Sequence, residues 1–142
     1  MIVLDANILL RMADRLDPQH ELTISAVFKK RLNDELVILP QSLYEFGAVA
    51  TRSLANNGLG MDSARLTRWI TRYRAMFQLL SEPPDLIDRW QAVISQFRIT
   101  GFQVHDARYV AAMQGLNLRT FMTHNLRHFK NYPIDVLDPR TV

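Results

Sequence analysis

The chain opens with Met1-Ile2-Val3-Leu4-Asp5-Ala6-Asn7-Ile8, in which an unbroken apolar run ends at a carboxylate that is followed two positions later by a carboxamide. Residues 2–4 show no alternation of apolar and polar side chains, which is the pattern of a strand buried on both faces of a parallel sheet. We therefore expect Asp5 at the carboxyl end of this strand. Ligands of open α/β sheets bind at that edge, because the loops and helix N-termini that follow the strands meet there.

Further short apolar stretches alternate with amphipathic ones along the rest of the chain. We expect strands at 36–39, 79–80, 119–123 and 134–137, and a brief extended piece at 102–104. We expect helices over 6–12 and 20–32, from Ser42 to the Asn56-Asn57-Gly58 stop, over 61–77, from Pro83-Pro84 to just before Gly101, and around Asp106 as far as Gly115. This alternation predicts an α/β fold with a parallel central sheet flanked by helices, and we find no repeat or linker, so residues 1–142 are interpreted as one domain.

The composition excludes several classes of protein. The chain has 142 residues, 48% of them apolar and 22% charged, which is ordinary for a soluble globular protein. It contains no cysteine, which excludes thiolate catalysis, Cys-ligated zinc and disulfides. Neither a secretion signal nor a run of about 18 apolar residues occurs. We expect a soluble cytoplasmic protein without a membrane segment.

The charge balance favours an anionic partner. The formal net charge is +3, and fourteen of the seventeen cationic residues are arginine, whose planar fork suits contact with phosphate. Arg65, Arg68 and Arg72 form one helical stripe, with Arg74 nearby. This stripe has two interpretations, an RNA-facing surface and an ordinary solvated face opposite the core side that carries Trp69.

Three acids stand at comparable places, and each has a structural explanation. Asp5 is suited to cap the helix that follows it, which stabilises a helix by about 1 kcal/mol. Ser42-Leu43-Tyr44-Glu45 fits the capping-box pattern, in which Glu45 bonds back to the amide of Ser42. Asp106 suits the dipole of the helix in whose first turn it lies. Taken singly, the structural explanation is the better one for Glu45 and Asp106. For Asp5 the structural and functional explanations are evenly balanced.

Taken together, the three acids favour a metal site. A parallel sheet brings its strand ends and the following helix starts to one edge, where two carboxylates 4 Å apart repel each other by about 4 kcal/mol at an effective dielectric constant of about 20. A divalent cation removes this repulsion. Oxygen ligands without cysteine suit Mg²⁺ or Mn²⁺, and such an ion supports phosphodiester hydrolysis.

Four short motifs contain these acids or follow the predicted strand at 119–123. They are Met1-Ile2-Val3-Leu4-Asp5-Ala6-Asn7, Tyr44-Glu45-Phe46, His105-Asp106-Ala107 and Thr123-His124-Asn125-Leu126-Arg127-His128-Phe129. This ordered set resembles a PIN domain, especially the VapC-type toxins of bacterial toxin-antitoxin pairs, over nearly the whole chain. The resemblance implies a metal-dependent endoribonuclease that leaves a 5′-phosphate and a 3′-hydroxyl.

The resemblance also implies roles for single residues and for partners. Asp5, Glu45 and Asp106 would hold Mg²⁺ or Mn²⁺, with Asn7 and Thr123 in support. It further implies homodimers that pair with an antitoxin. The apolar helices between Phe46 and Phe77 fit such an interface and fit core packing equally well.

Asn125 stands where the family commonly has a fourth acid. Its amide oxygen can ligate a metal or orient water, but it brings no charge, so the presence of a second metal is an open question. Some PIN-like sequences carry the same Thr-x-Asn pattern, so the asparagine does not imply inactivity. His105 and His124 beside the site have two interpretations, as phosphate or acid-base groups and as ordinary loop residues.

Two other functions fit part of the pattern. A phosphatase with Asp5 as covalent nucleophile also places an aspartate after its first strand, but such enzymes typically have Asp-x-Asp, and the third residue here is Asn7. A non-catalytic RNA-binding or partner-binding module is favoured by the missing fourth acid.

Overall fold

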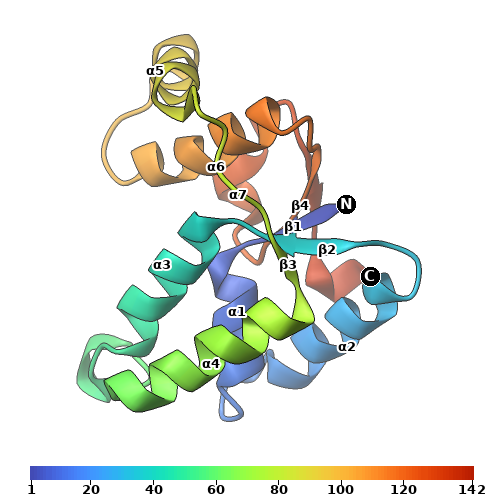
Figure 1. The fold of residues 1–142 in the computed structure, drawn as a ribbon, viewed down its shortest axis with the longest axis vertical. Helices are drawn as coiled ribbons and strands as arrows, with labels where there is room; N and C mark the ends of the chain where they lie inside the picture. The colour runs from blue at the N-terminus through green and yellow to red at the C-terminus, as the bar shows by residue number, and fades with distance from the viewer.

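The central feature of the computed structural model, which describes residues 1–142, is one sheet of five strands (Figure 1). All neighbouring strands pair in parallel, in the order β3-β2-β1-β4-β5, so the predicted parallel sheet is confirmed. The strands are β1 (Ile2–Leu4), β2 (Leu36–Ile38), β3 (Gln78–Leu79), β4 (Thr120–Met122) and β5 (Asp135–Leu137).

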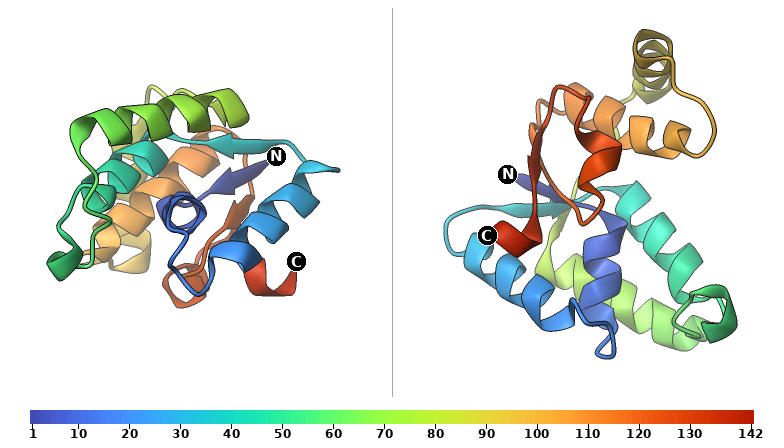
Figure 2. Two further views of the ribbon diagram at one scale, coloured as in Figure 1. Left: turned by 90° about the horizontal axis from the view of Figure 1, so that it is seen from below. Right: turned by 180° about the vertical axis from the view of Figure 1, so that it is seen from behind.

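Helices cover both faces of the sheet. They are α1 (Ala6–Ala13), α2 (His20–Arg31), α3 (Pro40–Ala50), α4 (Ser63–Met76), α5 (Leu86–Phe97), α6 (Gln103–Gly115) and α7 (Leu126–Phe129), with short 3₁₀ helices η1 (Leu54–Asn56) and η2 (Pro139–Thr141). Helices α1 to α4 pack on one face and α5 to α7 on the other (Figure 1). Helix α1 lies between α2 and α3 in both Figure 1 and the view from behind in Figure 2. No helix is long and apolar enough to cross a membrane.

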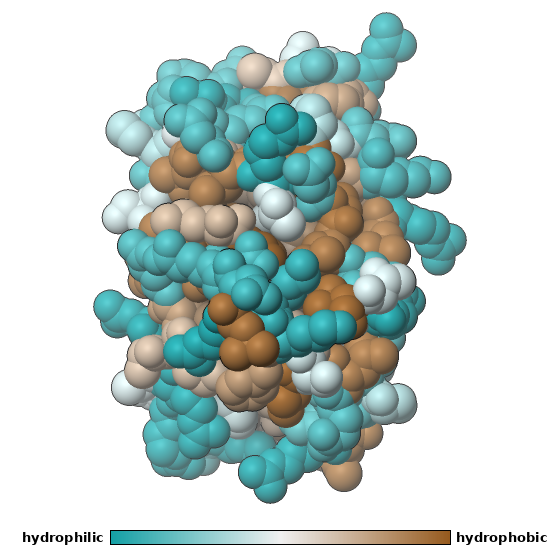
Figure 3. Space-filling model, turned by 90° about the vertical axis from the view of Figure 1, so that its right-hand side faces the viewer, coloured by the Kyte–Doolittle hydropathy of each residue, from teal (hydrophilic) through white to brown (hydrophobic).

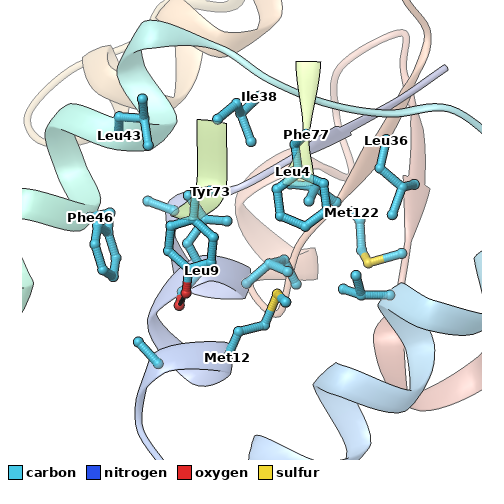
Figure 4. Packing of buried hydrophobic residues seen from close by; sticks show 14 of the residues in the cluster. Leu4, Leu9, Met12, Leu36, Ile38, Leu43, Phe46, Tyr73, Phe77 and Met122 are labelled. Atoms are coloured by element: carbon cyan, nitrogen blue, oxygen red, sulfur yellow. Dashed lines mark hydrogen bonds between the residues drawn. The ribbon is translucent and has the colours of Figure 1, made fainter. Parts of the chain in front are cut away.

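The strands are buried on both sides, as their continuous apolar runs predict. Leu4 faces the core under α1 to α4, and its neighbour Val3 faces the core under α5 to α7. In the first core Phe46 meets the ring of Tyr73 edge-on at 5.2 Å (Figure 4). Phe46 and Phe77 are both buried there, so core packing accounts for them.

The surface also carries apolar side chains. On the side shown in Figure 3, hydrophobic residues reach the surface in several groups that are separated by hydrophilic side chains. Leu16, Leu32 and Leu54 are each more than three-quarters exposed.

Three predicted segments differ from the structure. Helix α3 begins at Pro40, since proline is tolerated in a first turn, and it ends at Ala50 well before the Asn56-Asn57-Gly58 stop. Helix α5 begins only at Leu86, because the residues from Pro83 form a preceding turn closed by a 3.1 Å hydrogen bond from the Leu86 N–H to the Pro83 carbonyl. Residues 102–104 are not extended, because Gly101 at φ +64° turns the chain directly into α6.

Candidate active site

Asp5 lies at the carboxyl end of β1 and is 6% exposed. Its Oδ2 accepts a 2.6 Å hydrogen bond from the Thr123 hydroxyl and a 3.0 Å hydrogen bond from Nδ2 of Asn7. Although Asp5 occupies the N-cap position of α1, its side chain makes no capping hydrogen bond. The helix-capping explanation of this carboxylate is therefore wrong.

Thr123 and Asn7 join the ends of the neighbouring strands β1 and β4. Nδ2 of Asn7 donates to the Thr123 hydroxyl oxygen at 3.0 Å, and Oδ1 of Asn7 accepts a 3.2 Å hydrogen bond from the backbone N–H of His124. The backbone N–H of Asn125 donates to the same hydroxyl at 3.0 Å. The side chain of Asn125 is exposed and does not cap α7. Asn7 and Thr123 thus hold Asp5 directly, whereas Asn125 contributes its backbone to the network.

The capping box predicted for Glu45 is not present. Helix α3 starts two residues earlier than predicted, with Leu39 as its N-cap. The Ser42 hydroxyl instead donates to the carbonyl of Leu4 at 2.8 Å and accepts from the N–H of Leu39 at 3.2 Å. Glu45 therefore lies in the second turn, and its carboxylate is free for other contacts.

Two buried side chains bind the carboxylate of Glu45. Nε2 of Gln41, one turn earlier on α3, donates to Oε1 of Glu45 at 2.7 Å and to the carbonyl of His105 at 2.7 Å. The hydroxyl of Tyr109 on α6 donates to Oε2 of Glu45 at 3.4 Å and accepts from the N–H of Ala6 at 3.3 Å. These contacts connect α3 with the start of α6 and with the first residue of α1.

Asp106 lies in the first turn of α6, as predicted. Its Oδ2 is buried, accepts no well-directed hydrogen bond, and lies 3.1 Å from Nδ1 of His128 on α7. A buried carboxylate oxygen without a good donor is costly, so this atom is suited to bind an additional cation or donor.

The carboxylates share one electrostatic environment. Burial raises the pKa of Asp5 from 3.8 to about 7; the Thr123 hydrogen bond opposes this, and the charges of Glu45 and Asp106 add to it. Burial likewise raises the pKa of Asp106, with His128 opposing and Glu45 adding to the shift. The charge of Glu45 therefore disfavours the ionised forms of Asp5 and Asp106, although the three acids come from segments far apart in sequence.

The comparisons with solved structures identify the fold. No family profile and no curated protein matches the sequence. The fold is similar to VapBC2 from Rickettsia felis bound to a promoter DNA fragment, with a TM-score of 0.73, 13% identity, and coverage of 97% of this chain and 98% of that chain. For DNA-bound VapBC from Salmonella typhimurium the TM-score is 0.70 at 17% identity, with 97% of each chain covered. For VapC20 of Mycobacterium tuberculosis, a sarcin-ricin loop cleaving toxin, it is 0.62 at 12% identity, with 85% of this chain and 87% of that chain covered.

This chain has the PIN-domain fold. The predicted acids of the PIN domain fit Mg²⁺ or Mn²⁺ by donor chemistry, because they supply only carboxylate oxygens and repel one another. As the side chains lie, however, no three His, Asp or Glu residues are grouped so that they could hold a metal ion. Glu45 is turned toward Gln41 and Tyr109, and Asp106 toward His128. A shared ion would therefore require these carboxylates to move closer together; each hydrogen-bonded carboxylate oxygen keeps a second lone pair that can bind an ion.

The two histidines beside the candidate site differ in their surroundings. His105 is exposed, and its carbonyl accepts the hydrogen bond from Gln41. His124 is buried, and its Nε2 lies 2.9 Å from the hydroxyl oxygen of Thr23, which itself donates to the carbonyl of Gln19 at 2.7 Å. Nε2 of His124 therefore carries the hydrogen of this contact. This contact joins α2 to the loop after β4, so it gives His124 a structural role.

Sequence analysis missed three residues that contact the candidate acids, although the spacing offered a signal for two of them. Gln41 precedes Glu45 by four residues and Tyr109 follows Asp106 by three, and both spacings place side chains on one helix face. His128 lies inside the motif after β4, but its contact with α6 depends on how that loop folds.

The arginine stripe lies elsewhere on the PIN domain. Arg65, Arg68 and Arg72 line a groove of about 760 Å³ beside the end of α1, whereas Asp5 immediately precedes the start of that helix. The structure therefore separates these arginines from the acids by the length of α1.

Proposed function

We propose that the protein is a metal-dependent endoribonuclease that hydrolyses RNA phosphodiester bonds at Asp5, Glu45 and Asp106, with Asn125 assisting. The observation that carries the proposal is that Tyr109, on the helix of Asp106, bonds both Glu45 and the N–H of Ala6 beside the buried Asp5. The charges of Glu45 and Asp106 also raise the pKa of Asp5. Carboxylates within electrostatic reach of one another at a ligand-binding edge attract a cation, which supports a metal-dependent reaction at these acids. The fold shared with VapC20, a sarcin-ricin loop cleaving toxin, supports RNA as the substrate.

The chain's own groups would prepare the site. Thr123 and Asn7 fix the orientation of Asp5, and Tyr109 and Gln41 fix that of Glu45. Mg²⁺ or Mn²⁺ held by the three acids would supply Lewis-acid polarisation of a phosphoryl oxygen and a lowered pKa for water. The amide of the exposed Asn125 would bind and orient the attacking water or a phosphate oxygen.

We also propose that the protein pairs with a cognate antitoxin and forms a homodimer. The similar structures from Rickettsia felis and Salmonella typhimurium contain VapBC, which supports the antitoxin partner. The test is the mass of the purified protein in solution, measured alone and after co-expression with any small protein encoded beside it. A single-chain mass in both measurements would contradict the proposal.

The nuclease proposal is tested by cleavage of a mixed RNA pool in Mn²⁺, with mapping of the new ends. We expect Asp5→Asn and Asp106→Asn to abolish cleavage and EDTA to stop the wild type. Asp135→Asn is the matched control, because Asp135 is an exposed acid at the amino end of β5, on the opposite edge of the sheet. Equal cleavage by wild type and Asp5→Asn, unaffected by EDTA, would contradict the mechanism.

A second candidate is a non-catalytic RNA-binding or partner-binding module. It is favoured by the absence of a preformed three-ligand group and by Asn125 in place of a fourth acid. A Mn²⁺ titration separates the two functions, since a real metal site raises the unfolding temperature when it is filled and isolated surface acids do not. A phosphoryl group trapped on Asp5 would instead favour the phosphatase.

A further inference from the structure

A basic groove of about 760 Å³ lies at the end of α1 that is remote from Asp5. Its walls are the residues that end and follow α1, the segment around η1, and one face of α4; α4 and the end of α1 lie at the bottom of Figure 1. The charged side chains that line it are Arg15, Arg65, Arg68, Arg72 and a single acid, Asp14. Arg15 comes from a different segment than the predicted stripe, so the cationic residues surround a concavity.

The four arginines of this basic groove have no anionic partner. None of them forms an ion pair within 4.0 Å, although the chain has seven ion pairs, each between an arginine or histidine and an acid elsewhere in the chain. The carboxylate of Asp14 instead accepts a hydrogen bond of 3.1 Å from the backbone N–H of Leu16. Several unpaired guanidinium groups around one hollow repel one another, and an anionic ligand would relieve that repulsion.

One of these guanidinium groups is already held in place. The guanidinium carbon of Arg72 lies 4.5 Å from the centre of the Trp69 ring, a cation–π contact. A side chain fixed in this way loses less conformational freedom when it binds a phosphate. If these arginines only covered a solvent-exposed helix face, no such fixed contact would be needed.

We propose that the basic groove binds the phosphate backbone of single-stranded RNA at a distance from the acids that cleave it. This inference rests on the proposed function. Helix α1 has 8 residues and so spans about 12 Å between Asp5 and the groove. Helix α3 also connects the two regions, because it carries Glu45 in its second turn and leads through its C-terminal end toward η1. The distance between the two sites is therefore short enough for one extended RNA strand to span.

The composition of the basic groove favours a phosphate chain over an acidic peptide. All four cations are arginines, which present paired N–H donors to phosphate oxygens. Leu16 and Leu54 are highly exposed at the groove and offer apolar contact to unstacked bases. An acidic protein segment is the competing occupant and is included in the test below.

The test uses the full chain carrying Asp5→Asn, which is not expected to cleave RNA, and a labelled short single-stranded RNA as the probe. RNA affinity is measured by fluorescence anisotropy over a salt series after Arg68→Gln or Arg72→Gln is added. Arg74→Gln is the matched control, because Arg74 is exposed on the same helix but does not line the groove. Thermal unfolding of each variant establishes that it is folded.

We expect each groove variant to bind RNA about fivefold more weakly near 0.1 M salt and to lose roughly 0.7 from the salt slope, as for one phosphate contact. Arg74→Gln should bind as well as the parent. Equal losses in all three variants, or no loss in any, would overturn the inference. So would groove variants that keep RNA affinity but lose binding of polyglutamate.

Failure of this inference is distinguishable from failure of the proposed function. RNA cleavage by the wild type in Mn²⁺ is measured separately from binding. If RNA binding depends on Arg68 and Arg72 while the wild type cleaves no RNA, the basic groove binds RNA as inferred and the nuclease proposal is wrong. If the wild type cleaves RNA while binding is unaffected by either change, the groove inference alone is wrong.

Discussion

The hydroxyl of Tyr109 donates a 3.4 Å hydrogen bond to Oε2 of Glu45. Tyr109 is 1% exposed and follows Asp106 by one helical turn, so this contact couples the position of one acid to the helix that carries another. Gln41 binds the other carboxylate oxygen of Glu45 and the carbonyl of His105. The carboxylate is thus held by one neighbour on its own helix and by one on α6.

Tyr109→Phe should therefore weaken Mn²⁺ binding and lower kcat, because Glu45 loses a donor that orients it. Tyr73→Phe is the control, since Tyr73 is also buried and its hydroxyl donates to the carbonyl of Leu9 at 2.5 Å, away from the acids. Both changes should lower the free energy of unfolding by about 1 kcal/mol. Mn²⁺ affinity is measured by calorimetry. Equal Mn²⁺ affinity in the two variants would show that the Tyr109 hydroxyl has only a structural role.

Asp5 should make the metal-free protein less stable as pH rises from about 4 to about 7. Its pKa is about 7 in the folded protein against 3.8 as the ordinary value, so the native state binds the proton more tightly. The difference corresponds to roughly 4 kcal/mol at most. Asp5→Asn should remove this dependence and be more stable than wild type at pH 8. Urea unfolding in EDTA at pH 5 and pH 8 measures this.

Asp135→Asn is the control for that pH comparison, because Asp135 is exposed at the other edge of the sheet. A parallel pH dependence of wild type and Asp5→Asn would mean that Asp5 does not titrate near pH 7.

Mn²⁺ should reverse the destabilisation caused by Asp5 at pH 8. An ion that binds only the folded state at one hundred times its Kd stabilises by about 2.7 kcal/mol. We expect this gain for the wild type and little or none for Asp5→Asn or Asp106→Asn. Thermal unfolding with and without Mn²⁺ measures it. A similar gain in all three proteins would place the metal elsewhere.

The sequence predicts the positions of site residues relative to the strands and helices. The apolar run before Asp5 predicts a buried strand, and parallel pairing then places Asp5 beside Thr123 of the neighbouring strand. The apolar spacing after Asp106 likewise predicts the helix that carries it. These positions follow from periodicity, which a single sequence contains.

Contacts that depend on side-chain direction or loop path could not be predicted. The capping box for Glu45 failed because Pro40 allowed the helix to start earlier, which moved Glu45 out of the first turn. The convergence of Arg15 on the stripe of Arg68 and Arg72 depends on the loop after α1, whose path the sequence pattern does not specify. Gly101 was interpreted as a helix stop, but its positive φ starts the next helix.

His124 should make the protein sensitive to acid. Burial lowers its pKa from 6.5 to about 4, with the charges of Arg11 and Arg140 adding to the effect. The unfolded state therefore binds more protons in this range, and stability should decrease as pH falls from about 6.5 to about 4. His124→Gln, whose amide can still donate to Thr23, should lose this part of the pH dependence, whereas His105→Gln, a change at an exposed histidine, should retain it. Urea unfolding in EDTA across this range compares them, and identical acid sensitivity in both variants would refute the role assigned to His124.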